Sequence, residues 1–120
     1  MTIQEFYDRI GGGYEDAMAL MRKEERVRKY LGMFLKDETF AALEQAMGAD
    51  DMEAAFTAAH TLKGVTANLS LTRLQQLSSA LTEDLRYGRD LPHAREAFPE
   101  VAACYRETTE AIRQLLSDGQ

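Results

Sequence analysis

Three residues of one short segment could together form a nucleophilic site. His60, Lys63 and Gly64 are spaced so that they share one face of a helix. A histidine side chain titrates at about pH 6.5, so in a cell its imidazole is mostly neutral and can act as a nucleophile. A lysine one turn away supplies a positive charge beside it. This pattern indicates an imidazole that could act as a nucleophile beside a positive charge.

The surrounding residues predict a helix that leaves His60 on an open flank. At about 100° per residue, His60 points roughly 125° away from the centre of the apolar face, and Gly64 lies nearly opposite that face. Phe56 and Ala67 fall on the side of His60, where Phe56 is either an edge of the core or part of a docking patch. Lys63 lies at the edge of the apolar face, which follows the three-four spacing of a buried helix: Met52, Ala55, Ala59, Leu62, Thr66 and Leu69.

Glycine is an unfavourable residue inside a helix. It is about 0.5–1 kcal/mol less favourable there than alanine, so Gly64 needs a reason. One reason is close packing of a neighbouring helix, and the other is room for a partner protein. The outward direction of Gly64 favours the second.

The run Ala59-His60-Thr61-Leu62-Lys63-Gly64, continued by Ala67-Asn68-Leu69, resembles the histidine phosphotransfer (HPt) domains of bacterial and fungal two-component phosphorelays. Those domains carry the histidine, lysine and glycine at the same spacing. One departure is Ser70, where family members usually have glycine. Serine is small, so we expect only a modest change at the end of the helix.

The resemblance implies a division of roles between this chain and its partners. His60 would be the phospho-acceptor and Lys63 would stabilise the phosphoryl charge, while Gly64, Phe56 and Ala67 would serve docking. A response-regulator receiver domain would supply the acidic residues and the Mg²⁺ that phosphoryl transfer needs. A histidine kinase or hybrid kinase would be a second partner. We therefore expect a phosphocarrier that is not an enzyme and has no cofactor of its own.

Two residues of the next helix could also contribute. Helices joined near Ser70 would run antiparallel, which brings Thr82 within a turn of His60. HPt domains often have a hydrogen-bonding side chain at the position of Thr82 and a basic one at that of Arg86. The resemblance therefore implies phosphoryl or docking contacts for both. Thr82 is shorter than the usual glutamine, and the alternative for Arg86 is a solvated surface side chain.

Composition limits the class of protein. A chain of 120 residues with net charge −6 predicts one domain over residues 1–120 and has no basic run for nucleic acid. No apolar stretch reaches the roughly 18 residues of a membrane span. The polar N-terminus and the single Cys104, expected in the core, fit a reducing cytosol. We expect a cytoplasmic monomer.

Helical periodicity extends over the chain, and no alternating strand pattern is evident. The predicted fold is all-α: an antiparallel four-helix bundle over residues 24–117, with two short helices in residues 1–22 packed on it. The expected helices are one starting at a capping box of Thr2 and Glu5, then Tyr14–Met21, Glu24–Met47 with a bend near Asp37 and a C-cap at Gly48, Asp51–Leu69 capped by Asp50, and Leu71–Tyr87 capped by Ser70. The regular part of the last helix is expected at Pro99–Ser117, with a looser turn from Pro92, and Pro99 would begin or kink it.

Two other functions stay open at this level. A helical bundle could dock a receiver domain without any phosphotransfer. An enzyme, either a whole kinase or a metal-dependent hydrolase, is the third possibility, but Gly11–Gly13 lacks the following Lys-Ser/Thr of a nucleotide loop. The other histidine, His93, is expected at the surface. No cysteine stands at ligand spacing from either histidine, so a zinc site is not predicted.

Overall fold

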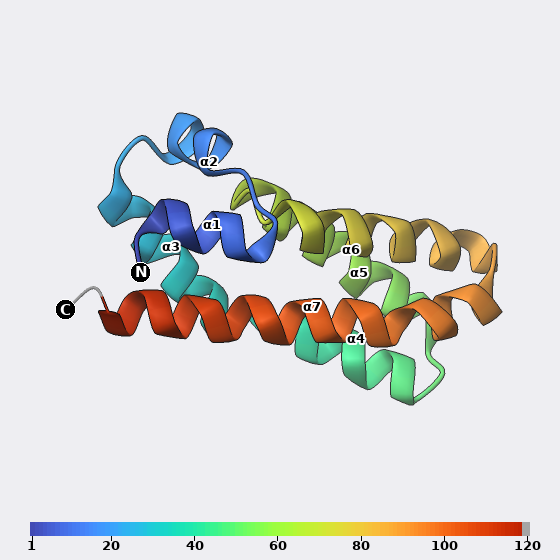
Figure 1. Cartoon of the computed structure of the whole chain (residues 1–120). Helices are drawn as coiled ribbons and strands as arrows, with labels where there is room; N and C mark the ends of the chain where they lie inside the picture. Colours follow the sequence, from blue (N-terminus) through green and yellow to red (C-terminus); the bar gives the residue numbers. More distant parts are fainter. Residues whose placement is uncertain (119–120) are drawn as a thin grey trace.

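The computed structural model describes residues 1–118, and within that range its regular structure is entirely helical, without a strand (Figure 1). The predicted all-α class is confirmed. None of the helices in this range is long and apolar enough to cross a membrane. The elements are α1 (Ile3–Ile10), α2 (Tyr14–Met21), α3 (Glu24–Leu35), α4 (Thr39–Gly48), α5 (Met52–Asn68), α6 (Thr72–Leu85), the 3-10 turn η1 (Arg86–Gly88) and α7 (Leu91–Asp118).

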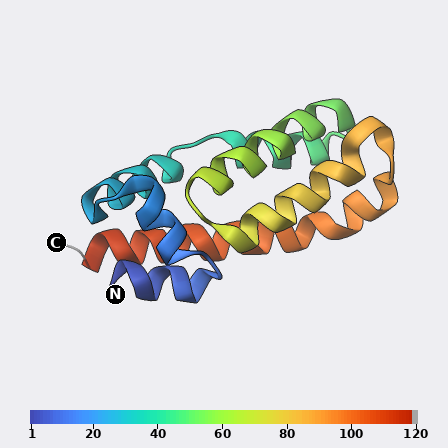
Figure 2. The same cartoon turned by 90° about the horizontal axis from the view of Figure 1, so that it is seen from above.

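The last helix runs the length of the molecule and is shared by both of its ends. Its 28 residues extend over about 42 Å at 1.5 Å per residue, which matches the 43 Å long dimension. One half of α7 completes a bundle with α4, α5 and α6, and the other half packs against α1 and α3 (Figures 1 and 2). Phe40 of α4 stacks on Phe98 and Tyr105 of α7. The predicted bundle with two short N-terminal helices is therefore confirmed, with α3 and α4 together as its first helix.

The expected continuous helix from Glu24 to Met47 is wrong, because residues 36–38 separate α3 from α4. The carboxylate of Asp37 accepts a hydrogen bond from the backbone amide of Thr39 at 2.8 Å. Aspartate side chains bond nearby backbone groups in this way and so compete with helix. The predicted bend is thus a complete break. At the other end of α4 the C-cap is Ala49 rather than Gly48.

The cap of α5 is one residue later than predicted. Asp51, not Asp50, accepts a hydrogen bond from the amide of Ala54 at 3.1 Å. Asp50 has a left-handed backbone with φ 57°. Its carboxylate accepts two hydrogen bonds from the guanidinium of Arg95 instead, which ties this turn to α7.

Ser70 does not cap α6, contrary to the prediction. It is buried in the α5–α6 turn with φ 55°, and the N-cap is Leu71, without a side-chain hydrogen bond. The left-handed backbone is the conformation that glycine adopts most easily. This conformation is a physical reason for the glycine that HPt domains usually have here.

The N-terminal segment is anchored to the same turn. The hydroxyl of Tyr7 donates a buried 2.8 Å hydrogen bond to the carbonyl of Leu69, and the amide of Gly13 donates to the carbonyl of Ser70 at 3.1 Å. A Cβ atom on Gly12 would lie 2.8 Å from that serine carbonyl and 2.6 Å from the tyrosine ring. The glycine therefore permits the close approach that joins α1 to the end of α5.

The last helix begins at Leu91, well before Pro99, so the predicted start is wrong. Asp90 is the cap, because its carboxylate accepts a hydrogen bond from the amide of His93 at 3.2 Å and its carbonyl accepts from Ala94 at 3.0 Å. Pro99 lies inside α7 at an exposed position, where water can reach the backbone carbonyl that proline leaves without a donor.

We predict that Tyr7→Phe destabilises the protein. The substitution keeps the buried ring but leaves the Leu69 carbonyl without a donor, which costs about 1–3 kcal/mol. The free energy of unfolding should fall by that amount in a urea titration followed by circular dichroism. Tyr30→Phe is the matched control, because Tyr30 is 41% exposed. An equal effect of the two substitutions would contradict the role of the hydrogen bond.

The turn between α6 and α7 carries a titratable pair. The His93 ring contacts the carboxylate of Asp84, and this hydrogen bond raises the pKa of His93 above its usual 6.5, with smaller contributions from the charges of Asp84, Asp90 and Glu96. A raised pKa in the folded state means that folding favours the charged ring. The stabilisation is therefore complete below about pH 6.5 and disappears as the pH rises through the folded pKa.

We predict that the difference in unfolding free energy between wild type and His93→Gln is largest near pH 5 and shrinks toward about pH 9. The two proteins differ only at residue 93, so the comparison isolates the pair. Asp84→Asn should remove the same pH-dependent part of the unfolding free energy. A wild-type advantage that stays constant over this range would show that the pair does not titrate as described. Urea titrations at a series of pH values make the measurement.

Candidate functional site

Helix α5 is buried along one face and open along the other. It packs between α4 and α6, its neighbours in the bundle (Figure 2). His60, Gly64 and Ala67 are exposed, as predicted, and Lys63 and Phe56 are half-buried at the edge of the packed face. The face toward the core consists of small or apolar residues, at the predicted positions Ala55, Ala59, Leu62 and Thr66 and, in addition, at Ala58.

The His60 ring is stacked on the ring of Phe56. The ring centroids are 6.0 Å apart and the planes differ by 10°. The two residues are one helical turn apart, and residues at this spacing meet on the helix surface. Contact with a half-buried ring restricts where the exposed imidazole can point. Phe56 therefore both touches the core and belongs to the surface beside His60.

A cation lies over the same phenylalanine. The guanidinium carbon of Arg86 is 5.0 Å from the centroid of Phe56, within the range of a cation–π contact. Glu83 holds this guanidinium by accepting hydrogen bonds from Nε at 3.2 Å and from Nη2 at 3.1 Å. Arg86 is thus an ordered neighbour of the His60 surface, in contact with Phe56.

Glu83 is a residue that the sequence analysis missed. The hydrogen bond from Arg86 holds the pKa of the Glu83 carboxyl below its usual range, and the charges of Arg86, Arg89 and Lys63 act in the same direction. Glu83 thus lies close to three cations, Lys63, Arg86 and Arg89. The spacing of Glu83 and Arg86, three residues apart on a helix, is a signal that could have revealed the pair.

Thr82 is not part of this surface, and its predicted contact with a partner or phosphoryl group is wrong. The side chain is fully buried, and its hydroxyl donates a 2.7 Å hydrogen bond to the carbonyl of Ser78. The antiparallel register places Thr82 near the height of His60, but the rotation of α6 directs it into the core. Arg86, four residues later, lies where α6 ends and can reach the surface.

Gly64 faces open space. Beyond its own helical turn, no part of residues 1–118 lies within 4 Å of a Cβ atom built on it. Close packing of a neighbouring helix, the alternative interpretation, therefore does not explain this glycine. The absence of a side chain leaves the backbone of α5 accessible one turn after His60.

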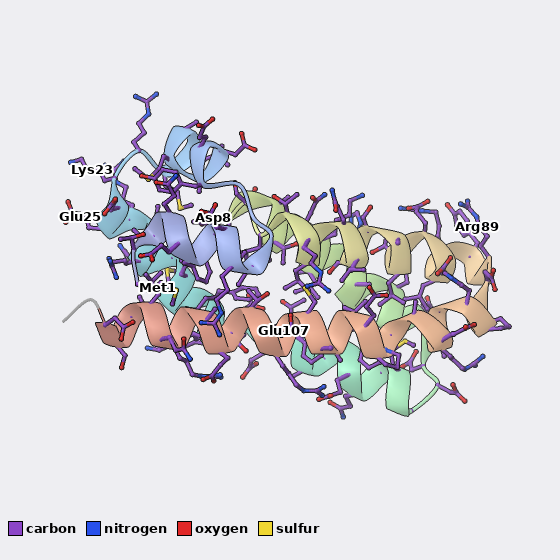
Figure 3. The ribbon with its side chains drawn as sticks, in the orientation of Figure 1. Met1, Asp8, Lys23, Glu25, Arg89 and Glu107 are labelled. Carbon is purple, nitrogen blue, oxygen red and sulfur yellow. The ribbon has the colours of Figure 1, made fainter. Side chains whose placement is uncertain are left out.

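The end of α6 adds a second feature that was not predicted. The regular helix stops at Leu85, and Tyr87 in η1 has φ 55° with its side chain 95% exposed. Arg89 follows at the end of the molecule far from Lys23 (Figure 3). A cavity of about 440 Å³ opens between this turn and the start of α5, and Phe56 and Arg86 line it. Gly88 also has a left-handed backbone, and a glycine here is the sequence signal that indicates the end of α6.

The remaining reactive groups lie elsewhere. Cys104 is buried, as predicted, and burial raises the pKa of its thiol. In the part of the chain that the structure describes, no group of three histidine, cysteine, aspartate or glutamate side chains is placed to hold a metal ion. His93 is exposed and pairs with Asp84 in the α6–α7 turn. Of the two histidines, His60 is therefore the one outside this ion pair.

Comparison with known proteins identifies the family. The Hpt domain model matches residues 29–118, which contain α4 to α7 and most of α3, and leaves α1 and α2 outside. No curated protein and no solved structure matches the chain. Hpt domains serve histidine phosphotransfer in phosphorelays, where they interact with kinases and receiver domains as phosphocarriers rather than catalysts. Since the match spans more than half of its length, the chain belongs to the Hpt domain family.

Proposed function

We propose that this protein carries a phosphoryl group on His60 and exchanges it with an aspartate of a response-regulator receiver domain. The observation that carries the proposal is the exposed imidazole, stacked on Phe56 and flanked by Lys63 and the open backbone of Gly64. A nucleophile that a large partner must reach needs exposure, a fixed direction and free space around it. These residues supply all three.

In the proposed reaction a neutral imidazole nitrogen attacks the phosphorus of an aspartyl phosphate. The new N–P bond forms while the P–O bond to the aspartate breaks, and the aspartate leaves as a carboxylate. The reverse reaction returns the group to a receiver. Mg²⁺ and the acidic residues that hold it belong to the receiver domain in this proposal. A histidine kinase or hybrid kinase is the proposed source of phosphate upstream.

The neighbours of His60 have distinct proposed roles. The charge of Lys63 offsets the phosphoryl oxygens, and Phe56 limits the rotation of the imidazole through ring contact. Arg86 contributes a second positive charge, but Glu83 holds it over Phe56. Ala67, exposed beyond Gly64, continues the surface that the receiver domain covers.

We predict that a receiver domain phosphorylated with acetyl phosphate in Mg²⁺ transfers label to the wild-type protein and not to His60→Gln. The label should survive base and be lost in acid, as expected of a phosphoramidate. His93→Gln is the matched control, since it removes the other histidine and should accept label normally. If wild type binds receivers but takes up no label from a panel of them, the protein is a docking module without phosphotransfer.

We predict that Gly64→Ala stabilises the protein but slows phosphoryl transfer. The added methyl group meets open space, and alanine favours helix over glycine by about 0.5–1 kcal/mol, so the free energy of unfolding should rise. The same methyl group would obstruct the partner, and overpacking of this kind costs about 1–3 kcal/mol, so the transfer rate should fall roughly tenfold.

Gly48→Ala is the control for this experiment. Gly48 also faces open space, at the end of α4. Its substitution should leave the transfer rate unchanged. Normal transfer by Gly64→Ala would remove partner access as the reason for this glycine.

A further inference from the structure

The cavity beside Phe56 has a lining suited to an apolar side chain. Its volume is about 440 Å³, and it lies between the start of α5 and the end of α6. Two charged side chains, Glu53 and Arg86, also line it, and Arg86 is already paired with Glu83. Most of the surface is apolar and comes from Met52, Phe56, Leu85 and Tyr87.

Tyr87 is placed at this cavity at a conformational disadvantage. A left-handed backbone with φ 55° is unfavourable for any residue with a Cβ atom, and the ring gains little from burial because the side chain is 95% exposed. Tyrosine is among the residues that contribute most to protein interfaces when a partner covers them. The fold alone gives no reason for a large exposed ring here, whereas a partner that buries it would.

The cavity is continuous with the surface around His60. Phe56 lines the cavity and is stacked on His60, with 6.0 Å between the ring centroids. An ordinary protein interface covers roughly 800 Å² on each partner, a disc of about 16 Å radius. A receiver domain that brings an aspartyl phosphate to His60 would therefore also cover the cavity one turn away.

We propose that this cavity anchors an apolar side chain of the receiver domain, with Tyr87 packing against it. This proposal rests on the proposed phosphotransfer function and adds a site that selects the partner. The anchor contributes no group to the reacting nitrogen and acts on docking. Its loss should therefore weaken binding of the receiver domain without slowing transfer in the complex.

The test uses the full chain and the receiver domain that phosphorylates wild type fastest. Tyr87→Gly removes the ring and suits the left-handed backbone, so its unfolding free energy should not fall. We expect its KM for the phosphorylated receiver to rise about tenfold or more, with kcat within about twofold of wild type. Tyr87→Phe, which keeps the ring, should restore the wild-type KM. Tyr30→Ala, which removes another exposed tyrosine, should leave KM unchanged.

Labelling with phosphoramidate distinguishes a failure of the anchor proposal from a failure of the proposed phosphotransfer function. This small donor labels His60 without a partner: its P–N bond breaks, ammonia leaves, and the imidazole nitrogen bonds to phosphorus. Wild type and Tyr87→Gly should be labelled equally. If wild type accepts phosphate from the receiver and Tyr87→Gly has the same KM, the anchor proposal is wrong while the function stands. A change in sedimentation by Tyr87→Gly without a change in KM would assign the cavity to self-association and overturn the proposal.

Discussion

The arrangement of this protein depends on one constraint: helix α5 must be packed tightly on one face while the other face stays open. The packed face is made largely of alanine, at Ala55, Ala58 and Ala59, so α4 and α6 can approach the α5 backbone closely. Small side chains add little apolar area each, and the stability of the assembly therefore comes from the larger residues around them. The bundle holds α5 from both sides, and the opposite face of α5 is left to His60 and Gly64.

Three cations near the end of α6 and on α5 act on one carboxylate, that of Glu83. Glu83 accepts hydrogen bonds from Arg86 and Arg89, and the charge of Lys63 acts on it as well. A phosphoryl group on His60 would compete with this carboxylate for the same cations. Under the proposed function, Glu83 would keep phosphohistidine from being held too tightly, and a carrier must release its phosphate as readily as it accepts it.

The features that follow from periodicity were predictable, and those that depend on single backbone angles were not. The packed face of α5, the exposure of His60 and the capping box of Thr2 and Glu5 agree with the sequence analysis. The left-handed backbone conformations of Ser70 and Tyr87 were not predicted, because tertiary contacts select such conformations against local preference. Thr82 was misplaced although it follows Ser78, which is also buried, by one turn. The height of a residue along a helix is easier to predict than the direction in which its side chain points.

The long final helix has a consequence for how the chain is made. α7 contacts α1 and α3 with one half and completes the bundle of α4 to α6 with the other. During synthesis, the apolar surfaces that pack on α7 therefore stay uncovered until its 28 residues follow. Nascent chains in that situation expose surface that promotes aggregation. For this protein, the time between the emergence of α1 and the completion of α7 is the period in which chaperone binding would matter most.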